Sequence, residues 1–266
     1  MVGAMGPFVV EYAQLLFRWL HLVAGVMWVG NLWFFNFVNA QLAKTYDAET
    51  KKKVVPELMP RVLYFFRYAA IYTWVTGFLL LGIVYYGGGV LLPSEGARFH
   101  NGPTAGIGFL SLLLAWVVYD LLWKSIPDET IAAVISFALI VAYAFGMGRL
   151  VSGRAMVIHV GAAFGTIMVC NVWMRIWPAQ KKILRGVTGK GPAPEASVAA
   201  MAGLRSKHNT YLSMPLLLAM VVASHFPGVY GSDYAWAFVA LFVLLGWALA
   251  KWLYVKSASP AVTAIE

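Results

Sequence analysis

The sequence has few charged residues and almost no cysteine. Only 12% of its 266 residues are Asp, Glu, Lys or Arg, against about 25% in soluble domains, which excludes a water-soluble enzyme. The single cysteine, Cys170, lies in an apolar stretch. A disulfide framework, an iron–sulfur cluster and a haem attached through a C-x-x-C-H motif are therefore excluded for these residues. Disorder is excluded as well, because 61% of the residues are hydrophobic and the mean hydropathy is +0.73.

Acidic residues are also scarce, with 11 Asp and Glu against 20 Lys and Arg, which gives a net charge of +9. In so apolar a chain, basic residues set membrane orientation. We therefore expect membrane lipid, and no nucleic acid, as a partner.

The sequence contains long apolar runs, and about 20 mostly apolar residues suffice to cross a bilayer. We predict an all-α integral membrane protein with about seven transmembrane helices in one bundle. The expected spans are Tyr12–Phe37, Tyr64–Tyr86, Ala105–Trp123, Ile131–Met147, Ala155–Trp177, Thr210–Phe226 and Tyr234–Tyr254. Proline and glycine stand between most of these runs, where helices should end.

We expect residues 1–266 to form one polytopic domain. Residues 179–205 are predicted to be a cytoplasmic loop and residues 257–266 a tail, with no cytochrome c domain. Sixteen of the 20 Lys and Arg lie near one set of helix ends, and the other four are Arg18, Arg98, Arg149 and Arg154. By the positive-inside rule the N-terminus is outside and the C-terminus is cytoplasmic.

Ionisable groups within the membrane are costly, so they tend to be paired or functional. With 1.5 Å per helical residue, His21 lies about 13 Å and His159 about 7–9 Å below the outer surface. Two imidazoles from different helices at similar depth could ligate the iron of one haem b, with a second haem as the alternative. His225 and His208 are the alternate ligands, and Arg18, one turn from His21, could pair with a haem propionate.

Other interpretations of these residues stay open. A membrane histidine is also a common hydrogen-bonding residue between helices. Gly161 and Gly165 form a G-x-x-x-G motif that favours close helix packing. For Asp120 we expect a salt bridge with Lys124 or Arg67.

Several stretches resemble one known family. The motifs are Arg18-Trp19-Leu20-His21, Tyr72-Thr73-Trp74-Val75-Thr76-Gly77-Phe78, Tyr119-Asp120-Leu121-Leu122, His159-Val160-Gly161-Ala162 and Arg205-Ser206-Lys207-His208-Asn209. Together they resemble the membrane-embedded N-terminal domain of bacterial PuuD-type urate oxidases, over roughly residues 12–255. The resemblance implies a multi-pass oxidoreductase of the bacterial inner membrane. Longer members carry a C-terminal cytochrome c domain, so we expect either that electrons pass here to a separate protein or that the short form has another role.

The leading hypothesis is a membrane oxidoreductase or electron-transfer protein that binds haem b. It would oxidise a small substrate such as urate, or relay electrons between quinone and a separate c-type cytochrome. One alternative is a small-molecule transporter or permease. Another is a structural subunit of a respiratory complex, and a homo-oligomer is a further expectation.

Overall fold

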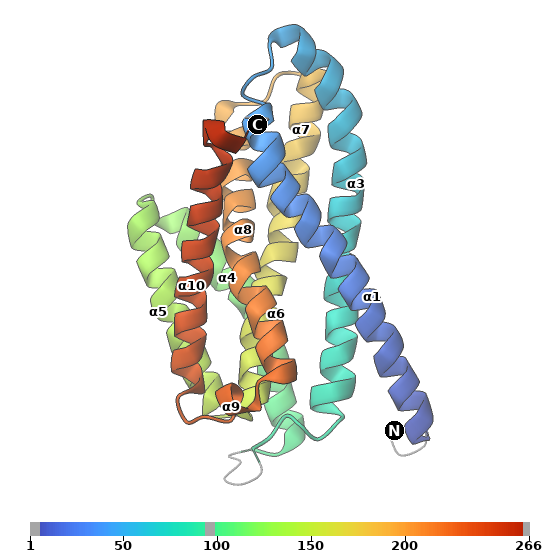
Figure 1. The fold of residues 1–266 in the computed structure, drawn as a ribbon, viewed down its shortest axis with the longest axis vertical. Coiled ribbons are helices and arrows are strands. Elements are labelled where there is room, and N and C mark those ends of the chain that lie inside the picture. The colour runs from blue at the N-terminus through green and yellow to red at the C-terminus, as the bar shows by residue number, and fades with distance from the viewer. Residues whose placement is uncertain (1–5, 94–98, 263–266) are drawn as a thin grey trace.

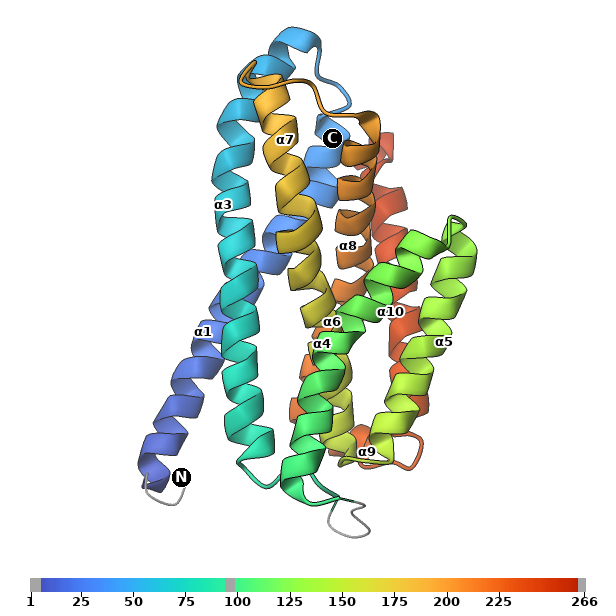
Figure 2. The same cartoon turned by 180° about the vertical axis from the view of Figure 1, so that it is seen from behind.

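The computed structural model describes residues 6–93 and 99–262, and these residues contain helices and no strand. Figures 1 and 2 show long helices running roughly along one axis. The helices are α1 (Pro7–Trp33), α2 (Ala40–Leu42), α3 (Ala48–Leu80), α4 (Asn101–Ser125), α5 (Glu129–Gly148), α6 (Gly153–Asn171), α7 (Trp177–Val187), α8 (Ala196–His225), α9 (Pro227–Tyr230) and α10 (Ala235–Ser257). Three π-helical segments, η2 (Phe34–Asn39), η3 (Leu81–Tyr86) and η4 (Val172–Ile176), and one 3-10 turn, η5 (Pro260–Val262), complete the order.

Short polar side chains fix where three of the helices begin. The carboxylate of Asp47 accepts a hydrogen bond from the Thr50 N–H at the start of α3, and this bond lowers the pKa of Asp47. Asp128 caps α5, and Ser152 caps α6. Such caps satisfy backbone N–H groups that have no partner within the helix.

Among the described residues, six helical stretches are long and apolar enough to cross a membrane, as expected of a multi-pass membrane protein. They are Phe8–Leu42, Ala48–Tyr86, Asn101–Ser125, Glu129–Gly148, Gly153–Val187 and Ala235–Ser257. Six of the seven predicted spans lie within or overlap these stretches. The other, Thr210–Phe226, overlaps the second half of α8, which has 30 residues but is less apolar. The predicted loop of residues 179–205 contains most of α7 and the first turns of α8.

Helix α6 is the centre of the bundle, since most of its residues are buried. It packs on α8 and α4, while α10 packs on α8 and α5, and α1 packs on the outer face of α3. The N-terminal end of α1 and the C-terminal end of α10 lie at opposite ends of the molecule (Figure 1). The residue 43–47 turn and the residue 188–195 connection share the end where α10 stops (Figures 1 and 2). Arg98, counted above for the outer side, lies outside the described residues.

Glycines permit the closest helix contacts. Around the G-x-x-x-G motif of α6, a Cβ added to Gly161 would lie 3.1 Å from Ala219 Cβ, and one added to Gly165 would lie 3.5 Å from Leu216 Cδ1. Both glycines therefore face α8, which confirms the packing interpretation. The contact between α10 and α8 at Gly246 is closer still, because a Cβ added to Gly246 would lie 2.6 Å from Pro215 Cδ.

Each π-helical segment carries polar side chains into the bundle. Asn36 in η2 donates hydrogen bonds to Leu32 O and Ser206 Oγ. Tyr86 in η3 and Arg175 in η4 reach partners on other helices. π-Helical turns inside α-helices often mark functional sites, so Asn36, Tyr86 and Arg175 are candidates for functional residues.

Candidate functional site

His21 is half-buried between α1 and α3. Its Nδ1–H donates to the backbone carbonyl of Thr73 at 2.9 Å and lies 3.2 Å from Thr76 Oγ1. Gly77 makes room for the ring, since a Cβ there would lie 3.0 Å from His21 Cε1. A carbonyl can only accept, so Nδ1 carries the proton and Nε2 keeps a free lone pair. Nε2 makes no hydrogen bond with any described residue.

His159 is fully buried on α6. Its Nδ1–H donates to the Ala155 carbonyl at 2.6 Å. By the same reasoning Nε2 is an acceptor, and the Tyr86 hydroxyl donates to it at 3.0 Å. A Cβ on Gly108 of α4 would lie 2.7 Å from this Nε2, so only glycine fits at that position.

The two histidines have separate surroundings. The contacts of His21 lie on α3, whereas those of His159 lie on its own helix, on η3 and on α4. Helix α3 packs on α1, and its Trp74 donates to Thr166 of α6 at 3.2 Å. Helix α3 thus lies between α1 and α6, and each imidazole is a candidate ligand on its own side of α3.

The remaining residues predicted near these histidines are less enclosed. Arg18 is exposed, and its charge acts on the Tyr85 hydroxyl of η3. His225 is exposed at the C-terminal end of α8, where its Nδ1 lies 3.3 Å from Val221 O. Arg154 donates instead to the Ala223 carbonyl at 2.8 Å, and its guanidinium lies 5.7 Å from the centre of the Tyr85 ring. Among the described residues, no hydrogen bond or ion pair joins Arg18, His225 and His159 directly, although Arg18 and Arg154 both act on Tyr85, next to the Tyr86 that bonds His159.

A second group of polar residues lies in the other half of the bundle. Its centre is Asp120 of α4, whose side chain is only 6% exposed. Arg175 donates to both carboxylate oxygens, at 3.0 Å and 2.5 Å, and Arg205 donates to Oδ1 at 3.1 Å. Lys124 adds a fourth contact at 2.8 Å. The predicted pair with Lys124 is confirmed.

The alternative partner of Asp120, Arg67, is wrong. Arg67 lies over the Trp177 ring, 3.9 Å from its centre. Its guanidinium is therefore held by aromatic faces near α7. The charge of Asp120 is balanced instead by arginines from η4 and α8.

Hydrogen bonds extend from Asp120 to His208. Tyr119, next in sequence to Asp120, lies under the Arg205 guanidinium at 4.9 Å, and its hydroxyl is 2.7 Å from His208 Nδ1. Asn171 Nδ2 donates to Tyr119 Oη at 3.1 Å and to Asn209 Oδ1 at 2.9 Å. We call these residues, together with Asp120, Arg175 and Arg205, the polar network. It joins α4, α6, η4 and α8.

Two atoms of the polar network lack partners. Asn171 Oδ1 and Arg205 Nη1 are buried and form no hydrogen bond with the described residues. Unpaired buried polar atoms are uncommon and ask for an explanation, such as bound water or ligand.

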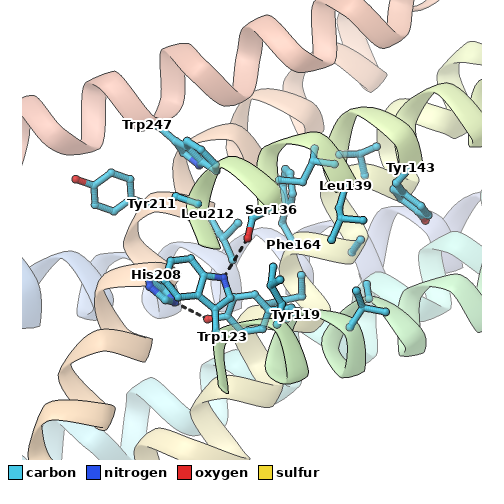
Figure 3. A pocket seen from close by; sticks show the side chains of 18 of the residues that line it. Tyr119, Trp123, Ser136, Leu139, Tyr143, Phe164, His208, Tyr211, Leu212 and Trp247 are labelled. Carbon is cyan, nitrogen blue, oxygen red and sulfur yellow. Dashed lines mark hydrogen bonds between the residues drawn. The ribbon is translucent and has the colours of Figure 1, made fainter. Parts of the chain in front are cut away.

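A cleft of about 490 Å³ adjoins the polar network. It lies between α4, α5, α6, α8 and α10, and Figure 3 shows Tyr119, Trp123 and His208 together on one part of its wall. Trp123 Nε1 donates to Ser136 Oγ at 3.1 Å, and its ring centre is 4.0 Å from that of His208. Most of the remaining wall is aliphatic or aromatic.

The contacts of Tyr86, Arg175 and Arg205 were not predicted from the sequence. Both arginines were interpreted as charges that set orientation, and Arg205 also as part of a family motif, but neither as a partner of Asp120. The signal that could have found them is Asp120 itself, because a carboxylate in an apolar span needs counter-charges. Tyr86 has no comparable signal, since a tyrosine at a helix end is usually an interface anchor.

The side chains of His21 and His159 share one chemical property of haem ligands, the hydrogen bond that each makes through Nδ1. Metal-bound histidines usually donate the other ring N–H to a carbonyl, and both His21 and His159 do so. At His159, the Tyr86 hydroxyl occupies the position that iron would take. Among residues 6–93 and 99–262 no group of three or more His, Cys, Asp or Glu side chains is arranged to hold a metal ion by itself.

Comparison with protein-family models identifies a family for this chain. The urate oxidase N-terminal family matches residues 7–53 and 45–265. No curated protein and no solved structure matches the chain. The family match covers nearly the whole sequence and agrees with the resemblance found in its motifs. The chain therefore belongs to the urate oxidase N-terminal family.

Proposed function

We propose that this chain is the membrane-embedded part of a haem-b oxidoreductase of the bacterial inner membrane. It oxidises a small substrate such as urate, or relays electrons between a quinone and a separate c-type cytochrome. The observation that carries the proposal is the state of His21. Its Nδ1–H donates to the Thr73 carbonyl, so Nε2 carries a free lone pair that could bind iron.

The protein's own part in this function is to hold and orient. Thr73 and Ala155 fix the tautomers of His21 and His159 through their carbonyls. Haem b, when bound, supplies one-electron redox chemistry. Binding at His159 would require the Tyr86 hydroxyl to leave Nε2, so the two histidines are expected to differ in occupancy.

Haem content tests this proposal. The purified protein should show a Soret band, and pyridine haemochrome analysis should give one haem per chain, or two if each histidine holds its own. His21→Ala and His159→Ala should each reduce the haem content. His100→Ala is the matched control, because His100 is exposed before α4, and it should leave the content unchanged.

Two outcomes would overturn the assignment. One is a preparation without a Soret band after expression with sufficient haem supply. The other is a haem content that stays unchanged when His21 and His159 are replaced together. If only His225→Ala lost haem, the residue that binds iron would be His225 at the end of α8.

A further inference from the structure

We propose that the cleft between α4, α5, α8 and α10 binds an isoprenoid quinone, with its ring beside Trp123 and His208. The volume of about 490 Å³ falls in the range of about 300–1,000 Å³ typical of small-molecule sites. The proposal deepens the proposed function, because it places the lipid-soluble electron carrier on this chain.

The polarity of the cleft is divided along its length. Tyr119, Trp123 and His208 lie at one end, and the pair formed by Lys207 and Glu129, 3.3 Å apart, lies beside them. Tyr119 and Ser111, which also lines the cleft, are eight residues apart on α4, or about 12 Å. Between these levels the wall is apolar, and its residues include Leu114, Leu139, Ile140, Val160 and Phe164. A flat head with polar edges and a hydrocarbon tail matches this division.

The hydrogen-bond pattern makes His208 a donor at the polar end. Tyr119 Oη accepts a hydrogen bond from Asn171 Nδ2. The Tyr119 hydroxyl proton needs an acceptor, and His208 Nδ1 lies within hydrogen-bond distance. Tyr119 therefore donates to Nδ1, and the neutral imidazole carries its proton on Nε2. This Nε2–H forms no hydrogen bond with the described residues.

An aromatic ring from α10 closes another side of the cleft. Trp247 lines the cleft opposite Trp123 (Figure 3), but its Nε1–H is fully buried, so a ligand in the cleft would contact the ring and not this N–H. The His208 N–H donor, with no free carboxylate beyond the paired Glu129 among the described lining residues, favours a neutral ligand with carbonyl oxygens. Quinones carry two such oxygens on a planar ring, which can also stack on indole and imidazole rings.

A lipid acyl chain fits this wall less well. It would fill the apolar part but leave the His208 N–H without a partner, and an unsatisfied buried donor is unfavourable. The unpaired His208 N–H is therefore the feature that distinguishes a quinone site from a crevice filled by a lipid acyl chain.

Quinone binding to the purified full chain tests the proposal. The probe is decylubiquinone, and its affinity is measured by titration calorimetry in detergent. The comparison ligand is the dimethyl ether of its quinol, which has the same tail but neither carbonyl nor hydroxyl groups. We expect the quinone to bind at least tenfold more tightly than the ether.

Variants on α5 locate the site. Ala133 lines the cleft, whereas Ala138 on the same helix is exposed and away from it. Ala133→Phe should weaken quinone binding at least tenfold, and Ala138→Phe should change it less than twofold. His208→Leu should weaken binding, and His208→Gln, which restores an N–H donor, should recover part of it.

Three results would overturn the inference. They are equal affinity for quinone and ether, equal effects of Ala133→Phe and Ala138→Phe, and no measurable binding by the folded protein. Equal affinity would assign the cleft to an acyl chain. Binding is measured without reference to haem, so failure here and a missing Soret band are separate outcomes.

Discussion

Replacing Asp120 by Ala should lower the free energy of unfolding by about 3–5 kcal/mol. Asp120 is the anion that Arg175 and Arg205 share, and the Arg205 side chain is only 4% exposed. Without the carboxylate, Arg205 would stay buried with no counter-charge. Thermal unfolding in detergent, followed by tryptophan fluorescence, should show a midpoint lower by roughly 10 °C.

Glu49→Ala is the matched control for Asp120→Ala. Glu49 also forms an ion pair, with Lys53 at 2.6 Å, but both side chains are more than 70% exposed. Exposed pairs contribute about 0–1 kcal/mol, so this variant should unfold close to the wild type. Similar losses in the two variants would contradict the interpretation. Adding Arg205→Met to Asp120→Ala should recover part of the stability, because it removes the unpaired charge.

Gly246→Ala should also destabilise the protein, by about 1–3 kcal/mol. The added Cβ would lie 2.6 Å from Pro215 Cδ and 2.9 Å from Pro215 N. Pro215 is inside α8, and its rigid ring and backbone cannot move aside without shifting the helix. Helices α8 and α10 would therefore have to separate along their contact.

Gly203→Ala separates this effect from helix propensity. Gly203 is in α8, and a Cβ there would meet nothing within 4 Å. Alanine is the better helix former by about 1 kcal/mol, so Gly203→Ala should raise the unfolding midpoint slightly. If both variants shift the midpoint in the same direction, close packing at Gly246 does not explain its effect.

The membrane helices could be predicted because apolar runs and helix breakers are local features. The ends at Asp128 and Ser152 are examples, since each side chain caps the helix that follows. The full length of helix α8 was harder to predict. Its first half carries Arg205 and Lys207, so hydropathy identified only its second half as a span.

The polar network could not be predicted from sequence in detail. Its members come from α4, α6, η4 and α8, and their association depends on how the helices pack. The apolar runs around His21 and His159 predicted that both residues lie in long apolar helical stretches. Their different neighbours, and the position of α3 between α1 and α6, depend on the packing of helices far apart in the chain.

The low apolarity of α8 has a consequence for biogenesis. A segment with two basic residues in its first half inserts poorly into lipid by itself, because each charge near the membrane centre is unfavourable. The partner of Arg205 is Asp120 on α4, which the ribosome makes earlier. Insertion of α8 should therefore wait on the earlier helices and proceed against them, so that the final helices join the membrane as one cooperative assembly step.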